Sequence, residues 1–99
     1  MVKEINENEL NEVTKEGKVL VDMYATWCGP CKMLSPIIEE LASTNKEYKF
    51  YKLDVDTCDE IPQKYGVMSI PTLLIFENGS LKETVVGLRS KTELESLLK

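Results

Sequence analysis

The sequence has 99 residues, of which 42% are hydrophobic and 29% charged, with a net charge of −5. This is the composition of a soluble globular protein with room for one core, so we expect a single domain spanning residues 1–99. No apolar run approaches the ~20 residues of a membrane span, and the first residues lack the apolar core of a signal peptide, which predicts a cytoplasmic protein without a membrane partner. The acidic balance, without a lysine or arginine cluster, argues against a nucleic-acid partner.

The first half of the chain predicts strands and helices in alternation. Residues 2–5 indicate a short strand followed by a polar helix. Residues 19–25 are apolar at nearly every position, which is typical of a central strand buried on both faces of a parallel sheet. Apolar residues at helical spacing then predict a helix to about Asn45, with Pro36 inside it.

The second half of the chain predicts three strands and two helices, and the last two strands follow each other without a helix between them. Residues 48–55 indicate a strand, and residues 56–65 a short helix. Two strands, 72–76 and 81–86, flank an asparagine–glycine turn and predict a hairpin. A capping box at residues 90–93 begins the closing helix. The order βαβαβαββα predicts an α/β fold: a mixed central sheet, mainly parallel with an antiparallel C-terminal hairpin, and helices on both faces.

A cysteine pair marks the junction between the central strand and the long helix. Cys28 and Cys31 are three residues apart and can face each other across one turn, with Cys28 near the helix N-terminus, where unpaired amides favour a thiolate. Pro30 suits the first helical turn, and Gly29 leaves room for an incoming disulfide. The spacing and setting favour a redox-active pair.

Other interpretations of the cysteines remain open. Three cysteines and no histidine are fewer ligands than a closed zinc site needs, which weakens a metal site. The odd, low count also argues against a secreted, disulfide-stapled domain and favours a reducing compartment. A structural bridge, an exported oxidase, or a binding module with idle cysteines are the further alternatives.

Three other residues, Asp22, Trp27 and Cys58, are candidates for a functional role, and each has a structural alternative. Asp22 is a carboxylate within the apolar central strand; it either faces solvent at a sheet edge or is buried, in which case desolvation raises its pKa and lets it exchange a proton with Cys31. Trp27 is either a core aromatic or an apolar contact on the rim of the site. Cys58 has no partner at useful spacing and lies among acidic residues, so we expect it to be inert, with a regulatory or dimer-forming role as the alternative.

Residues 21–32 resemble the active-site segment of thioredoxins. The resemblance covers nearly the whole chain and is highly specific, because it continues through residues 52–56, 64–67, 70–72, 78–79 and Gly87. It implies the thioredoxin fold and a general protein dithiol–disulfide oxidoreductase that works through a mixed disulfide. Glutaredoxins usually carry proline–tyrosine between the cysteines and protein disulfide isomerases glycine–histidine, so the glycine–proline pair here favours the reducing branch.

The resemblance also implies roles for individual residues. It assigns Asp22 the proton transfer and makes Lys52 its charged neighbour. It implies a cis bond before Pro71, which leaves the backbone of Ile70 free to pair with an extended substrate. The substrate surface implied by the resemblance consists of Trp27, Gly29, Pro30, Val67, Ile70, Pro71 and Gly87.

Partners follow from the same resemblance. It implies client proteins with exposed disulfides and a thioredoxin reductase, usually a flavoprotein that uses NADPH, while the chain itself binds no cofactor or metal and is a monomer. The sequence departs from the family at Met23 and Tyr24, where phenylalanine and tryptophan are common, and at Met68 and Ser69. These departures bear on redox tuning and partner choice.

Overall fold

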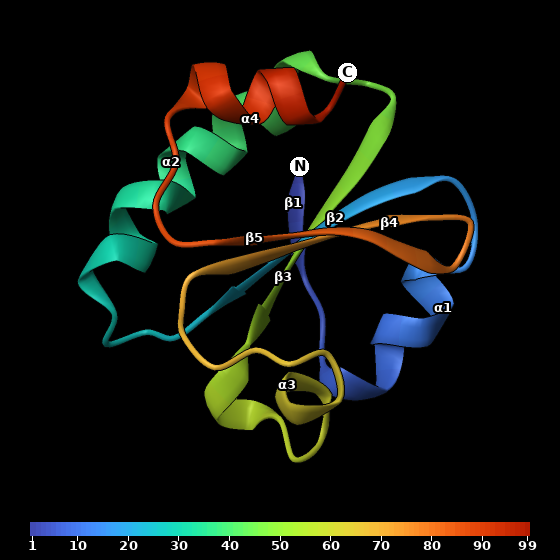
Figure 1. The fold of residues 1–99 in the computed structure, drawn as a ribbon, viewed down its shortest axis with the longest axis vertical. Helices are drawn as coiled ribbons and strands as arrows, with labels where there is room; N and C mark the ends of the chain where they lie inside the picture. Colours follow the sequence, from blue (N-terminus) through green and yellow to red (C-terminus); the bar gives the residue numbers. More distant parts are fainter.

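Five strands form one mixed sheet in the order β1-β3-β2-β4-β5 in a computed structural model that describes all residues, Met1–Lys99. Helices α2 and α4 lie on one side of the sheet and α1 and α3 on the other (Figure 1). The elements in chain order are β1(Val2–Glu4), the 3₁₀ turn η1(Glu7–Glu9), α1(Leu10–Thr14), β2(Lys18–Tyr24), α2(Gly29–Thr44), β3(Tyr48–Asp54), the 3₁₀ turn η2(Val55–Thr57), α3(Ile61–Lys64), β4(Thr72–Glu77), β5(Ser80–Val86) and α4(Lys91–Leu97). The predicted order βαβαβαββα and the mixed sheet are confirmed. The prediction of a mainly parallel sheet is wrong, because β4 pairs antiparallel with β2 as well as with β5, so parallel and antiparallel ladders are equal in number.

Strand β2 lies at the centre of the sheet. It pairs with β3 in parallel and with β4 in antiparallel orientation. The outer ladders repeat this division, since β1 is parallel to β3 and β5 is antiparallel to β4. All five inner residues of β2 are buried, as expected for a strand covered on both faces.

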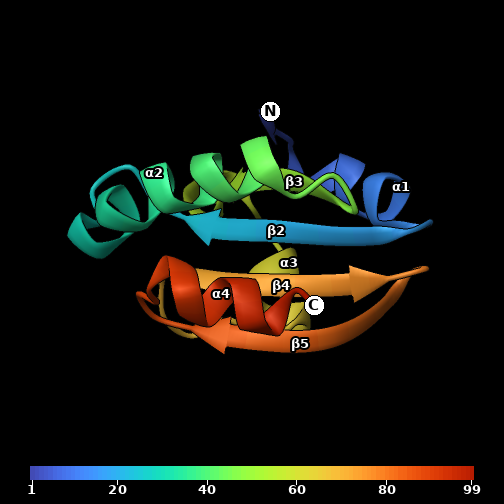
Figure 2. The ribbon, with the colours of Figure 1, turned by 90° about the horizontal axis from the view of Figure 1, so that it is seen from above.

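The core is divided between the two faces because side chains alternate along each strand. Leu20 of β2 joins the cluster under α2 and α4, whereas Val19 and Val21 join the cluster under α1 and α3. Figure 2 shows α2 beside β2 and β3, and α4 beside β4 and β5. None of these helices is both long and apolar enough to cross a membrane.

Two local predictions in the C-terminal part of the chain, the hairpin turn and the capping box, are confirmed. Asn78 and Gly79 have φ angles of 51° and 88°, the left-handed values that a two-residue hairpin turn requires. Ser90 and Glu93 form the reciprocal capping box that begins α4.

The helix predicted over residues 56–65 is wrong. A 3₁₀ turn and the four-residue helix α3 stand in its place, separated by an extended Cys58. The N–H groups of Asp59, Glu60 and Ile61, which a continuous helix would use for its own hydrogen bonds, donate to the carboxylate of Glu7 instead. Pro62 occupies the first turn of α3, the only place where its missing N–H costs nothing.

Glu7 of η1 fixes the start of α3 from 52 to 54 residues away. Its carboxylate accepts the backbone N–H groups of Asp59, Glu60 and Ile61 at 2.8, 2.8 and 2.6 Å. These bonds lower the pKa of Glu7, because they stabilise the ionised form. The N-terminal segment thus anchors the stretch of chain that leads to Ile70.

Glu7→Gln tests this anchor. We expect the amides of Asp59, Glu60 and Ile61 to exchange hydrogen faster than in the wild type, because a neutral amide accepts these bonds more weakly. Hydrogen exchange measured by NMR checks this. The control is Glu12→Gln, which removes the same charge from an exposed side chain of α1. Since the folded pKa of Glu7 is lowered, the protection should be present near neutral pH and fall as the pH drops through that pKa. Equal exchange in Glu7→Gln and Glu12→Gln would contradict the anchor.

Candidate active site

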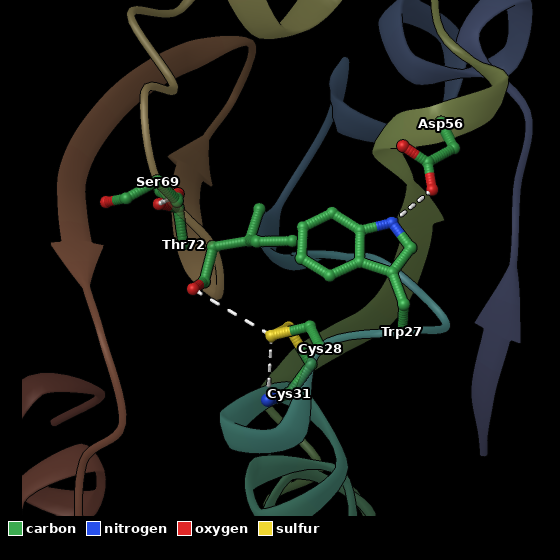
Figure 3. Close-up of a disulfide and its surroundings, with 7 residues drawn as sticks. Trp27, Cys28, Cys31, Asp56, Ser69 and Thr72 are labelled. Atoms are coloured by element: carbon green, nitrogen blue, oxygen red, sulfur yellow. Dashed lines mark hydrogen bonds between the residues drawn. A yellow bond between two sulfur atoms is a disulfide. The ribbon is translucent and has the colours of Figure 1, made fainter.

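Cys28 and Cys31 form a disulfide at the start of α2, with Cα atoms 5.3 Å apart (Figure 3). Cys28 is the N-cap residue, and its Sγ accepts the backbone N–H of Cys31 at 3.2 Å. Gly29 and Pro30 are exposed in the first turn between them. The pair therefore lies where the helix amides and dipole favour negative charge on sulfur.

The turn before the helix holds Cys28 against the end of β2. The N–H of Cys28 donates to the carbonyl of Ala25 at 3.3 Å, and the N–H of Lys32 donates to the carbonyl of Cys28 at 3.2 Å. Ala25, Cys28 and Cys31 are buried together in a small cluster. The central strand thus delivers both sulfurs to the edge of the core.

Asp22 is buried in β2 with 4% of its surface exposed, which excludes the solvent-facing alternative. Its Oδ1 has no hydrogen-bond partner. It faces Lys52 in the β2–β3 register and lines a cavity of about 230 Å³ together with Cys31 and Lys52. Burial raises the pKa of Asp22 to about 7, and Lys52 opposes this rise while Glu4 adds to it. This carboxyl can therefore take up or release a proton near neutral pH.

Trp27 lies on the rim with 68% of its surface exposed. Its indole Nε1–H donates to Asp56 Oδ2 at 2.7 Å, as Figure 3 shows. Trp27 lines a hollow of about 300 Å³ with Val67, Met68 and Ile70 among its other walls. Met68 is 96% exposed. The surface beside the cysteines is therefore apolar and open.

The segment before β4 faces the cysteines from the other side. The Ile70–Pro71 bond is cis, as the resemblance implied. The carbonyl oxygen of Ile70 lies 3.9 Å from Cys28 Sγ. Gly87 donates its N–H to the Pro71 carbonyl at 2.8 Å, whereas the backbone of Ile70 makes no backbone hydrogen bond. An extended peptide can pair with this free backbone.

Cys58 is separate from the pair. It is a free, half-buried cysteine that packs against the core cluster on the α1 and α3 side of the sheet. Burial raises the pKa of its thiol, and Glu7 adds to the rise, so the thiolate fraction at neutral pH is small.

Two other features do not contribute a second site. No group of three or more cysteine, aspartate or glutamate side chains is arranged to hold a metal ion. The largest hollow, about 600 Å³ between β5 and α4, is lined by none of the predicted site residues.

Four residues around the site had no assigned role in the sequence prediction: Glu4, Tyr24, Asp56 and Met68. Of these, Tyr24 and Met68 were noted as departures from the family that bear on redox tuning and partner choice. The hydroxyl of Tyr24 donates to both carboxylate oxygens of Glu4, at 2.6 and 2.8 Å. Tyr24 attracted attention only as a departure from the family, and nothing in the local sequence pattern of Glu4 or Asp56 signals these contacts.

The geometry defines a class of protein. When reduced, a cysteine pair in the first turn of a helix and beside free backbone can exchange with a disulfide of another chain, because the helix terminus favours the attacking thiolate. Proteins with this chemistry are protein dithiol–disulfide oxidoreductases.

Comparison with known proteins gives the family. The family model described as Thioredoxin matches residues 1–99. The thioredoxin of Listeria monocytogenes is 48% identical over 99 residues, which cover 99% of this chain and 96% of that protein. The thioredoxin of Bacillus subtilis is 50% identical over 86 residues, 86% of this chain and 83% of that one. The crystal structure of a Malassezia sympodialis thioredoxin superposes with a TM-score of 0.90 at 36% identity, covering 99% of this chain and 88% of that one. The chain belongs to the thioredoxin family and is a thiol–disulfide oxidoreductase.

Replacing Asp22 should stabilise the protein in a pH-dependent way. Because the pKa of Asp22 rises from 3.8 to about 7 on folding, the folded state keeps a proton that the unfolded state loses between these values. The free energy of unfolding therefore falls as the pH rises between these two values, and the total loss is about 4 kcal/mol once the pH is above both. Asp22→Ala should raise the free energy of unfolding by about 2–4 kcal/mol at pH 8 and change it by less than about 1 kcal/mol at pH 4. Urea unfolding of the oxidised protein at both pH values checks this; an equal effect at both would contradict the assignment.

Proposed function

We propose that the chain is a general protein-disulfide reductase in which Cys28 is the nucleophile. The observation that carries this proposal is the position of Cys28 Sγ, which caps α2 and accepts the N–H of Cys31. In the reduced protein these groups favour the thiolate. The thiolate attacks one sulfur of a client disulfide; a bond forms between Cys28 and the client, and the other client sulfur leaves as a thiolate.

Cys31 then resolves the mixed disulfide. It gives its proton to Asp22, directly or through water in the cavity that the two residues share, and its thiolate attacks Cys28 Sγ. The second client sulfur leaves, so the client gains two electrons and the Cys28–Cys31 disulfide forms. Lys52, across the sheet register from Asp22, stabilises the carboxylate before the proton arrives.

Substrate binding combines an apolar surface with a backbone edge. Trp27, Val67 and Ile70 line the hollow beside the pair. We infer that an extended client segment pairs with the free backbone of Ile70 while apolar side chains contact this hollow. Gly29, Pro30 and Gly87 complete the proposed surface. Pro71 is itself buried, so it supports the segment from within, where its carbonyl accepts the Gly87 N–H.

A reductase must return two electrons to the pair after each turnover. We infer that this partner is a thioredoxin reductase, a flavoprotein using NADPH, so that flavin and NADPH belong to the partner and the chain binds no cofactor of its own. Family membership supports this role. We further infer that residues 1–99 act as one domain, as a monomer, in the cytoplasm, on client proteins with exposed disulfides.

Reduction of insulin disulfides with dithiothreitol as electron donor tests the reaction. We expect Cys28→Ser to reduce the rate to that of dithiothreitol alone, because the thiolate favoured by the helix N-terminus is lost. Cys31→Ser, reduced beforehand and mixed with insulin after removal of dithiothreitol, should accumulate a mixed disulfide between Cys28 and insulin, detectable by mass spectrometry, because the resolving thiol is absent. Cys58→Ser is the matched control and should retain the wild-type rate. An inactive wild type, or loss of activity in Cys58→Ser, would refute the assignment.

The role of Asp22 can be tested by measuring only the step in which Cys31 resolves the mixed disulfide. Single-turnover kinetics should show a rate that rises through about pH 7 in the wild type, where Asp22 loses its proton. Asp22→Asn should slow resolution roughly tenfold or more near neutral pH and abolish this dependence. Asp59→Asn, which alters an exposed carboxylate, serves as the control. If Asp22→Asn and the wild type gave the same profile, Asp22 would not be the proton acceptor.

A further inference from the structure

Tyr24, which lines the cavity that contains Asp22, holds the carboxylate of Glu4. Its hydroxyl donates to Glu4 Oε1 and Oε2 at 2.6 and 2.8 Å, although Glu4 is on the exposed edge strand β1. Burial and the bond to Glu4 raise the pKa of Tyr24, so the phenol stays protonated and remains a donor. Glu4 is therefore held in one position rather than free in solvent.

Lys52 lies between two carboxylates. In the sheet register it is the partner of Glu4 on one side and of Asp22 on the other. Side chains at the same level of neighbouring strands point to the same face, so all three share the α2 side of the sheet. Lys52 forms no ion pair with either carboxylate. Its Nζ lies over the Tyr24 ring instead, 5.9 Å from the centroid.

Three charged side chains thus lie at one level of neighbouring strands, with Glu4 exposed, Lys52 partly buried and Asp22 buried, and their net charge depends on Asp22. When Asp22 is ionised, the three side chains carry two negative charges and one positive charge. When Asp22 is protonated, only the opposite charges of Glu4 and Lys52 remain. The negative charge of Glu4 acts in the same direction as burial and raises the pKa of Asp22. Glu4 therefore favours the arrival of a proton on Asp22.

We propose that Glu4, held by the Tyr24 hydroxyl, is a positioning residue for proton transfer: its negative charge, across Lys52 from Asp22 in the sheet register, helps to set the pH at which Asp22 accepts the Cys31 proton. This inference rests on the proposed role of Asp22. It gives a function to Tyr24, one of the positions where the chain departs from its family.

The groups around Asp22 are few enough to assign the effect. Its partner on β4 is the uncharged Leu73. The titratable or charged groups that share its cavity or act on it electrostatically are Glu4 of β1, Tyr24 of β2, Lys52 of β3, and Cys31 and Lys32 of α2. Asp54, at the end of β3, acts on Tyr24. Glu4 is the only carboxylate among those that act on Asp22.

The carboxyl ¹³C signal of Asp22, followed against pH in the oxidised protein, tests the coupling directly. Neither cysteine titrates when they are joined, so the midpoint reports Asp22 alone. Glu4→Gln should lower this midpoint by roughly half a pH unit, a size set by a partly solvated charge pair. Glu83→Gln on β5, the opposite edge of the sheet, removes the same charge and should leave the midpoint unchanged.

Tyr24→Phe separates the anchor from the charge. It keeps the ring over Lys52 and removes the hydroxyl, so Glu4 is released into solvent and the midpoint should fall by less than in Glu4→Gln. In the Glu4→Gln background, Tyr24→Phe should add nothing, because Tyr24 acts through Glu4. Additive effects of the two substitutions would overturn the anchoring role.

A midpoint in Glu4→Gln that equals both the wild type and Glu83→Gln would overturn the proposal. The outcome does not depend on catalysis, because the titration is made on the resting disulfide. The rate of mixed-disulfide resolution then completes the test: its pH profile in Glu4→Gln should move by the same amount as the carboxyl midpoint. A midpoint that moves while the rate profile stays fixed would instead refute the role proposed for Asp22 and, with it, a catalytic effect of Glu4.

Discussion

Burial of β2 on both faces is the constraint on which the site depends. Its apolar side chains pack alternately into the two core clusters, and each fully buried side chain of this size contributes roughly 1.5–3 kcal/mol. A strand held this firmly can carry one unpartnered carboxyl, whose ionisation costs about 4 kcal/mol for a pKa displaced to about 7. The same strand ends at the turn that places Cys28 on the helix. Packing therefore supports both Asp22 and Cys28, the groups to which we assign the acid–base and nucleophilic roles.

The two cysteines and Asp22 come from adjacent parts of the chain, whereas the surface facing them is built from distant parts. Glu7 anchors α3, and the chain then passes through Val67 and Met68 to the Ile70 carbonyl beside Cys28. Asp56 steadies the indole of Trp27 from the same stretch. One strand–helix junction thus supplies the cysteine pair and the buried carboxyl, and one irregular segment supplies the surface that we propose for contact with another protein.

Much of this arrangement could be predicted from the sequence because its signals are local. The Asn78–Gly79 turn, the Ser90 capping box and the polar residue within the apolar run around position 22 can each be recognised from a few neighbouring residues. The predicted helix over residues 56–65 failed because its competing hydrogen bonds come partly from Glu7, more than fifty residues away. The contact of Glu4 with Tyr24 depends on the pairing of β1 with β3, and a three-residue edge strand carries too little pattern to fix that register.

Trp27 has a consequence for how this protein can be watched at work. It is the only tryptophan of the chain, it is mostly exposed, and it precedes the disulfide by one residue. All indole fluorescence therefore originates at the reactive surface. A client that covers the indole, displaces it from Asp56 or changes the oxidation state of the neighbouring sulfur alters the whole signal rather than a fraction of it. The molecule carries its own optical probe beside the cysteine pair, on the surface that we propose for partner binding.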